Sequence, residues 1–150
     1  MDKGTLQAIW IKRIKGGEMD AVSSATLVPG LGIVGNADQG GERQVTVMEE
    51  EVWEDLMKQV GASLPPSERR ANLMVSGVRL HNTEGRVLRI GACRIRVGGE
   101  ATPCGRMDDA AEGLRELMSE QWRGGAYGEV VEGGEISIGD PVHWEAYPAP

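Results

Sequence analysis

The sequence predicts a mainly β protein: a closed or partly closed β-barrel of about eight short strands with two or more peripheral helices. Its 22 glycines are spread along the chain and separate short apolar runs, instead of gathering in one linker. Turn signals at this spacing are typical of β domains with many turns. Phe is absent and aromatic residues make up only 4% of the chain. The core must therefore be built from Val, Ile, Leu, Met and Trp.

The strands are predicted from short apolar or alternating runs that the glycines and other turn residues separate. In chain order they cover residues 6–14, 44–47, 72–75, 87–90, 92–97, 127–131, 135–138 and 142–146. Strands of this length and spacing close most readily into a barrel or a sandwich, because closure leaves few unpaired edges.

Two segments show helical periodicity instead. Residues 49–60 carry one apolar stripe that Gly61 terminates, and its members are Val52, Leu56 and Val60, with Trp53 and Met57 beside them. Residues 108–122 show the same period at Leu114, Leu117, Met118 and Trp122, with Asp108 or Asp109 as a natural N-cap. Both stripes are expected to pack on the core.

The length of 150 residues suits a single domain over residues 1–150, with core motifs at about 5–142 and a frayed tail at 147–150. No apolar run approaches the ~20 residues that span a bilayer. Residues 1–17 lack the basic start, apolar stretch and cleavage site of an export signal. We therefore expect a cytoplasmic protein without a membrane partner.

The net charge is −7, from 23 acidic and 16 basic residues. Nonspecific attraction to phosphate backbones is not expected at this charge, so nucleic acid is not a predicted partner. Arginines nevertheless crowd the centre of the chain, at positions 69, 70, 86, 89, 94, 96 and 106. They predict either a site for a small anion or solvated strand faces.

The two cysteines differ in their surroundings, and a reducing cytosol would keep both as thiols. Cys104 lies just before the predicted helix and two residues from Arg106. The helix dipole and the nearby cation both favour the thiolate there, so Cys104 is the predicted reactive sulfur. Cys93 alternates with Ile95 and Val97 on one face of a predicted strand. It is expected to face the core and to be inert.

Other motifs in the sequence do not predict a functional site as clearly as Cys104 does. The run from Gly30 to Gly35 matches a dinucleotide fingerprint in letters, but the turn-forming residues after it do not start the helix that such a site needs. His81 and His143 lie far apart and do not suggest zinc. A hydrolase triad of Cys104, a histidine and an acid stays possible, although nothing local orders such a base.

Six segments in a fixed order carry a family resemblance. They are Gly32-Ile33-Val34-Gly35-Asn36, Arg43-Gln44-Val45-Thr46, Arg69-Arg70-Ala71-Asn72-Leu73 with Ser76-Gly77, Arg89-Ile90-Gly91, Pro103-Cys104 followed by Gly113-Leu114, and Val130-Val131-Glu132-Gly133-Gly134 through Ile138-Gly139-Asp140. Together they resemble the MOSC domain, named for the C-terminal domain of molybdenum cofactor sulfurases. The chain departs from the family at Asn36-Ala37-Asp38, where members often carry Asp and then His.

The resemblance implies a mostly β barrel in which Cys104 carries the chemistry. Two roles are attributed to the family. One is a sulfur carrier that accepts sulfane sulfur from a pyridoxal-phosphate cysteine desulfurase, and the other is a site whose cysteine ligates the metal of the molybdenum cofactor (molybdopterin). The second role includes reductases of N-hydroxylated compounds, which need a separate electron-donor protein. Tightly bound pyridoxal phosphate is not expected in this chain. A non-catalytic barrel that binds a ligand or partner is a further alternative.

The resemblance also implies cofactor contacts. Arg43, Arg70 and Asn72 match motif positions, and Arg106 lies beside the motif cysteine. A guanidinium can hold the phosphate of a pterin ligand by two parallel hydrogen bonds. The alternative for these residues is structural: an ion pair of Arg43 with Glu42 or Glu49, and a turn capped by Asn72.

Overall fold

The computed structural model describes residues 3–146, so the predicted tail at 147–150 lies outside the described residues. Its strands are β1 (Lys3–Lys12), β2 (Met19–Val22), β3 (Ser24–Val28), β4 (Gly32–Ile33), β5 (Val45–Glu49), β6 (Leu73–Ser76), β7 (Val87–Ile90), β8 (Cys93–Glu100), β9 (Ala126–Glu132), β10 (Gly134–Ser137) and β11 (Pro141–Trp144). Its helices are α1 (Glu50–Val60), the 3₁₀ turn η1 (Pro66–Arg69), α2 (Arg106–Ala110) and α3 (Leu114–Met118).

The main sheet closes on itself, which confirms the predicted barrel. Its strand order is β11-β7-β8-β9-β5-β6-β1-β2, and β11 also pairs with β1. Seven strands therefore form the barrel, and β2 extends it from the far end of β1. The long strand β1 makes this possible because it pairs with β11 near Lys3, with β6 in its middle and with β2 near Lys12. A second sheet holds β10, β3 and β4.

All eight predicted strands are present, β7 with the predicted ends and the other seven with shifted ends, and three strands of the described residues were not predicted. The three are β2, β3 and β4. They carry little hydrophobic signal: β2 has no fully buried residue, β3 buries only Ala25 and Leu27, and β4 has two residues. Gly32 and Ile33 form β4 itself, and residues 34–44 continue as turns and irregular chain, so no helix follows the glycine-rich run.

The first predicted helix is confirmed and the second is wrong as a single helix. Helix α1 ends where Gly61 adopts a left-handed conformation with φ of 71°. Residues 108–122 instead form part of α2 and the separate α3, because Gly113 turns the chain with φ of 84°. Neither predicted aspartate caps α2, whose N-cap is Gly105. The Asp108 carboxylate accepts a hydrogen bond from the backbone N–H of Arg115 at 3.2 Å, in the first turn of α3.

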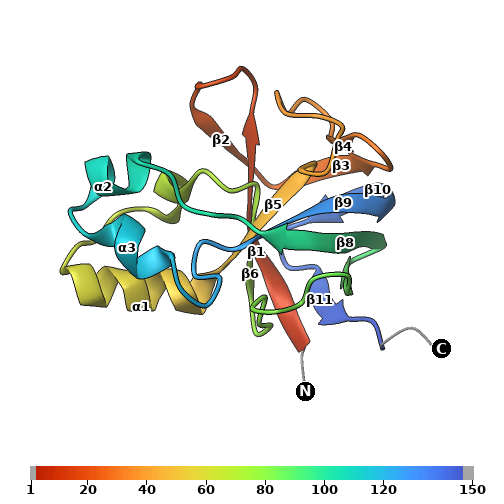
Figure 1. The fold of residues 1–150 in the computed structure, drawn as a ribbon. Coiled ribbons are helices and arrows are strands. Elements are labelled where there is room, and N and C mark those ends of the chain that lie inside the picture. Colours follow the sequence, from red (N-terminus) through yellow and green to blue (C-terminus); the bar gives the residue numbers. More distant parts are fainter. Residues whose placement is uncertain (1–2, 147–150) are drawn as a thin grey trace.

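Two apolar clusters hold the fold together. One fills the barrel, and Cys93 is part of it, so the prediction that Cys93 faces the core is confirmed. The other lies between the barrel and the helices, with Trp53 and Leu56 of α1 packed beside Met107, Leu114 and Met118. Figure 1 shows the three α-helices gathered on one side of the strands. The second cluster thus anchors the segment that carries Cys104.

Where β5 meets α1, Glu49 makes stability depend on pH. Burial raises the pKa of Glu49 to about 7, the charge of Glu51 adds to this effect, and the Leu80 N–H and Arg79 oppose it. A raised pKa stabilises the fold below the unfolded value of about 4.5, and this contribution is lost as the pH rises through about 7.

Glu49→Gln, which mimics the protonated acid, is therefore expected to leave stability nearly unchanged at pH 4, below the unfolded pKa. At pH 8.5 it should raise the free energy of unfolding by about 1–3 kcal/mol, the pKa difference reduced for partial exposure. Urea unfolding at both pH values measures this difference. Glu54→Gln, at an exposed position of α1, is the control. Equal pH dependence in the two variants contradicts the prediction.

Candidate functional site

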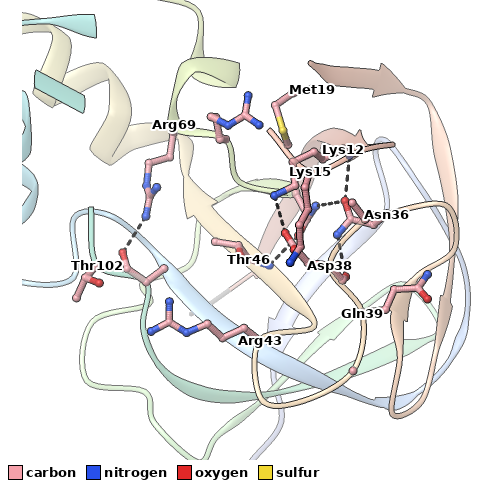
Figure 2. Close-up of a pocket in the computed structure, with 15 residues that line it drawn as sticks. Lys12, Lys15, Met19, Asn36, Asp38, Gln39, Arg43, Thr46, Arg69 and Thr102 are labelled. Carbon is pink, nitrogen blue, oxygen red and sulfur yellow. Dashed lines mark hydrogen bonds and ion pairs between the residues drawn. The ribbon is translucent and has the colours of Figure 1, made fainter. Parts of the chain in front are cut away.

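A pocket of about 550 Å³ opens at the end of the barrel where β1, the chain after β4, and the residues before β6 come together. Figure 2 shows the side chains that line it. Five are cationic: Lys12, Lys15, Arg43, Arg69 and Arg70. Asp38 is the single carboxylate among the lining residues. In a protein of net charge −7, such a concentration of positive charge is electrostatically suited to an anion.

Two asparagines form the buried wall of this pocket, Asn36 at 5% and Asn72 at 7% exposure. The Asn72 amide nitrogen donates to the Trp10 carbonyl and to Asn36 Oδ1, both at 3.3 Å, and Asn72 Oδ1 accepts from the Thr46 N–H at 3.1 Å. Asn72 therefore ties β1 to β5. Since both its N–H groups are used inside the protein, it offers a ligand only the remaining lone pair of its oxygen.

The segment that departs from the family pattern is built into the same wall. Asn36 Oδ1 accepts from the Lys12 backbone N–H at 2.9 Å. Asn36 also donates to the carbonyl of Asp38 at 3.1 Å. The Asp38 carboxylate lies 2.5 Å from Lys12 Nζ. This ion pair neutralises one lysine, so the pocket keeps an excess of positive charge on Lys15 and the three arginines.

Two of the predicted cofactor residues lie in this pocket as cations. Arg43 is exposed, and its guanidinium carbon lies 4.7 Å from the ring centre of Tyr127. Among the described residues it stacks there rather than pairing with either candidate glutamate. Arg70 follows η1 in a left-handed conformation, with φ of 64°, and donates to the Gly17 carbonyl at 2.7 Å. That bond fixes Arg70 against the turn between β1 and β2.

Arg106 lies apart from the other predicted residues. It is absent from the lining of the cationic pocket and instead lines a neighbouring pocket of about 690 Å³, together with Glu68 and Asp109. Arg70 and Met19 line both pockets. The structure thus brings Arg43, Arg70 and Asn72 together in one pocket and places Arg106 in the next.

Arg69 belongs to the arginine-rich part of the chain but is not among the four predicted cofactor contacts. It is only 8% exposed and still lines the cationic pocket. Burial lowers the pKa of Arg69 from its usual value, and the nearby Cys104 sulfur acts in the opposite direction. Arg69 therefore lies close enough to Cys104 for their charges to interact.

Cys104 is exposed and lies between Thr102, which lines the cationic pocket, and Arg106 of the neighbouring pocket. Its carbonyl accepts from the Met107 N–H at 3.0 Å in the turn that opens α2. Helix α2 has five residues, far fewer than the predicted helix, so its dipole is weak.

The matching family model is that of the MOSC domain, and it covers residues 13–143. The chain belongs to the MOSC family. Solved structures share this fold: the YuaD protein from Bacillus subtilis superposes with a TM-score of 0.81 at 18% identity over 97% of both chains. YiiM from Escherichia coli superposes with a TM-score of 0.72 at 18% identity, over 97% of this chain and 72% of that chain.

YiiM from Geobacillus stearothermophilus superposes with a TM-score of 0.75 at 15% identity, over 95% of this chain and 75% of that one. Identities this low show the fold alone. No curated protein matches the chain in sequence. The MOSC family is linked to binding of the molybdenum cofactor. Among residues 3–146, none of the helices has the length and apolar character needed to cross a membrane.

The two thiols of this MOSC domain should differ sharply in reactivity. Burial raises the pKa of Cys93, with Asp140 and Glu132 adding to the effect, and its side chain is 0% exposed. Cys104 is exposed beside the Arg69 cation. Limiting iodoacetamide near neutral pH is therefore expected to label Cys104 at least ten times faster than Cys93, since the reactive species is an accessible thiolate (about tenfold per pKa unit).

Peptide mass spectrometry of native and denatured protein, both free of cofactor, measures this ratio. Denaturation should remove most of the difference, because it exposes Cys93 to water. Equal labelling in the native state contradicts the prediction.

Proposed function

We propose that this MOSC domain binds the molybdenum cofactor, or carries sulfur for its maturation, through Cys104. The observation that carries the proposal is an exposed thiol two residues along the chain from Thr102, which lines a pocket with five cationic side chains in an acidic protein. A soft thiolate next to an anion site suits a ligand that combines phosphate with a thiophilic metal or sulfur.

The residues present fit an anionic pterin. The pocket volume of about 550 Å³ falls in the range of small-molecule sites. Arg43, Arg70 and Lys15 would hold the phosphate, because charge-assisted hydrogen bonds from guanidinium and ammonium groups are the strong kind. Asn72 Oδ1 and the side chain of Gln39 would meet the polar edge of the pterin, as both residues line the same pocket.

The metal-ligand role belongs to Cys104. The bound cofactor would supply a metal centre for oxygen-atom or sulfur chemistry. The chain's own contribution is to present a soft sulfur ligand in its ionised form and to hold the anionic part of the ligand away from it. The thiol is exposed, so it needs no opening of the fold to meet that ligand.

The sulfur-carrier role uses the same thiol. In that role the Cys104 thiolate attacks the outer sulfur of a persulfide on a cysteine desulfurase. The new bond joins the Cys104 sulfur to the transferred sulfur, and the donor cysteine leaves as a thiolate. No net oxidation occurs, because the sulfane sulfur is passed on in the same oxidation state. The cationic pocket would then stabilise the negative charge of the carried persulfide.

Metal and sulfane-sulfur analysis of the full chain, purified from a host that makes molybdenum cofactor, tests the proposal. Stoichiometric molybdenum, lost when the host lacks the cofactor, supports cofactor binding. Absence of molybdenum together with a stable persulfide on Cys104 supports the carrier role. Protein with neither, after incubation with cofactor and with a persulfide donor, overturns both and favours a non-catalytic barrel.

A further inference from the structure

Asp38 contributes the single carboxylate among the residues that line the cationic pocket. Its charge opposes that of the five cationic side chains, and its side chain is 46% exposed. A carboxylate inside an anion site lowers the affinity for any simple anion, because like charges at short range repel each other. A site that served only to hold phosphate would therefore bind more tightly without Asp38.

The wall of the pocket fixes the position of this carboxylate. The Asn36 amide nitrogen donates to the Asp38 carbonyl at 3.1 Å, and Asn36 Oδ1 accepts from the Lys12 N–H at 2.9 Å. The Ala37 N–H donates to the Lys12 carbonyl at 2.6 Å. These bonds hold residues 36–38 against the end of β1. Asp38 and Lys12 are therefore presented side by side in the pocket, as Figure 2 shows.

Asp38 keeps acceptor capacity beyond its ion pair with Lys12. The pair joins Asp38 Oδ2 to Lys12 Nζ at 2.5 Å. An ionised carboxylate has two oxygens with about four lone-pair positions, so one ammonium group uses only part of them. The other positions can accept a hydrogen bond from a ligand and cannot donate one. Two parallel N–H groups suit a carboxylate best, as in its pairing with a guanidinium fork.

The pocket thus combines donors for an anionic group with an acceptor for N–H groups. Lys15 and Arg43 are exposed cations of its lining, and Asp38 is the acceptor. A molecule that joins a phosphate to an aminopyrimidinone ring offers both kinds of group, because the edge of that ring carries adjacent N–H donors. The 2-amino-4-oxo ring of a pterin is of this kind. Inorganic phosphate has no such edge to compensate for the charge of Asp38.

We propose that Asp38 is the specificity-determining residue of the cationic pocket: its carboxylate accepts from the N–H edge of a ring while the cations hold the anionic group of the same ligand. The pocket then disfavours simple anions and selects a phosphorylated aminopyrimidinone. The inference rests on the proposed function in taking this pocket as the site of a pterin ligand. It assigns no role to Cys104.

The test compares two probes on the full chain free of cofactor. They are 6-hydroxymethylpterin phosphate, followed by its own fluorescence, and inorganic phosphate, followed by calorimetry. Asp38→Asn is expected to lower the Kd for phosphate about threefold to tenfold, because a like charge is removed. It should raise the Kd for the pterin phosphate at least about threefold, because the charge-assisted bonds are lost. The preference for the pterin phosphate should therefore fall about tenfold or more.

Two further variants separate this role from a general change of charge. Glu42→Gln removes an exposed carboxylate that precedes Arg43 in the chain and does not line the pocket, so the preference should stay unchanged. Lys12→Met removes the partner of Asp38 and one cation of the lining. It should weaken the binding of both probes and keep the preference. Thermal unfolding checks that each variant folds, and Asp38→Ser, with the same expectation, replaces Asp38→Asn if that variant does not.

An unchanged preference in folded Asp38→Asn or Asp38→Ser overturns the inference, because the carboxylate would then serve only as a structural partner of Lys12. A wild-type protein that binds phosphate as tightly as the pterin phosphate, or that binds neither probe, overturns it as well. Molybdenum or a persulfide found on such a protein would leave the proposed function standing. A protein with the predicted preference that takes up neither molybdenum nor sulfur would instead refute the proposed function alone.

Discussion

Cys104→Ser is expected to abolish molybdenum or sulfane-sulfur binding while leaving the fold intact. The hydroxyl is a hard, weakly acidic group that neither ligates a soft metal centre well nor carries a persulfide. The side chain at this position is exposed, so its exchange removes little packing. The free energy of unfolding should change by no more than about 0.5 kcal/mol, as is usual for surface substitutions.

The measurement is molybdenum and sulfane sulfur per chain in wild-type and variant protein purified side by side, with thermal unfolding of both. Cys93→Ala is the matched control, since Cys93 is fully buried in the barrel. That control should lose about 1 kcal/mol or more of stability through the cavity it leaves, yet keep the bound molybdenum or sulfur. Binding at the wild-type level in Cys104→Ser would show that the thiol is not the functional group.

The barrel was predictable because a strand that is buried on one face shows alternating apolar and polar residues in its sequence. In β8, Cys93, Ile95 and Val97 are buried while Arg96 is exposed, as the sequence pattern predicts. Strand β2 gives no such signal, because its burial is slight and its place is set by pairing with β1.

The second predicted helix was wrong for a different reason. The apolar stripe there is real, but Gly113 in the left-handed region lets the same buried side chains come from two short helices.

The site was predictable only in part, because its residues are brought together by contacts between distant strands. Arg70 and Asn72 could be selected because family motifs mark them, and they do line one pocket. The contribution of Lys12 depends on the course of β1 toward Asn36, which no local pattern reports.

Arg69 shows the limit most clearly. It is adjacent to Arg70, and the left-handed backbone at Arg70 falls at the end of η1, where the two side chains take different surroundings. Arg69 is buried and donates to the Ala101 and Gly124 carbonyls, whereas Arg70 remains partly exposed between the two pockets. The sequence alone does not indicate which of two neighbouring arginines is buried and which is exposed to a ligand. A signal was nevertheless present, since the doubled arginine lies within the matched family segment.

Arg70→Ala is expected to weaken cofactor binding by about 1.5–3 kcal/mol, the usual scale of a charge-assisted hydrogen bond. Arg70 lines the cationic pocket and is held there by its bond to the Gly17 carbonyl. Loss of that bond at a partly exposed position should cost only about 0.5–1 kcal/mol of stability. The effect should therefore appear as molybdenum lost on dilution and gel filtration, with little change in Tm.

Arg13→Ala is the matched control for Arg70→Ala, because both arginines bond within the β1–β2 hairpin region. Arg13 pairs with Asp20 at 3.0 Å in an exposed position and does not line the cationic pocket. The Arg13→Ala variant should lose a comparable hydrogen bond and still retain the cofactor. Arg70→Lys, which keeps the charge but not the planar fork, should fall between wild type and Arg70→Ala. A large fall in Tm with unchanged retention in Arg70→Ala would make Arg70 a structural residue, and the anion site would then depend on Arg43, Arg69 and Lys15.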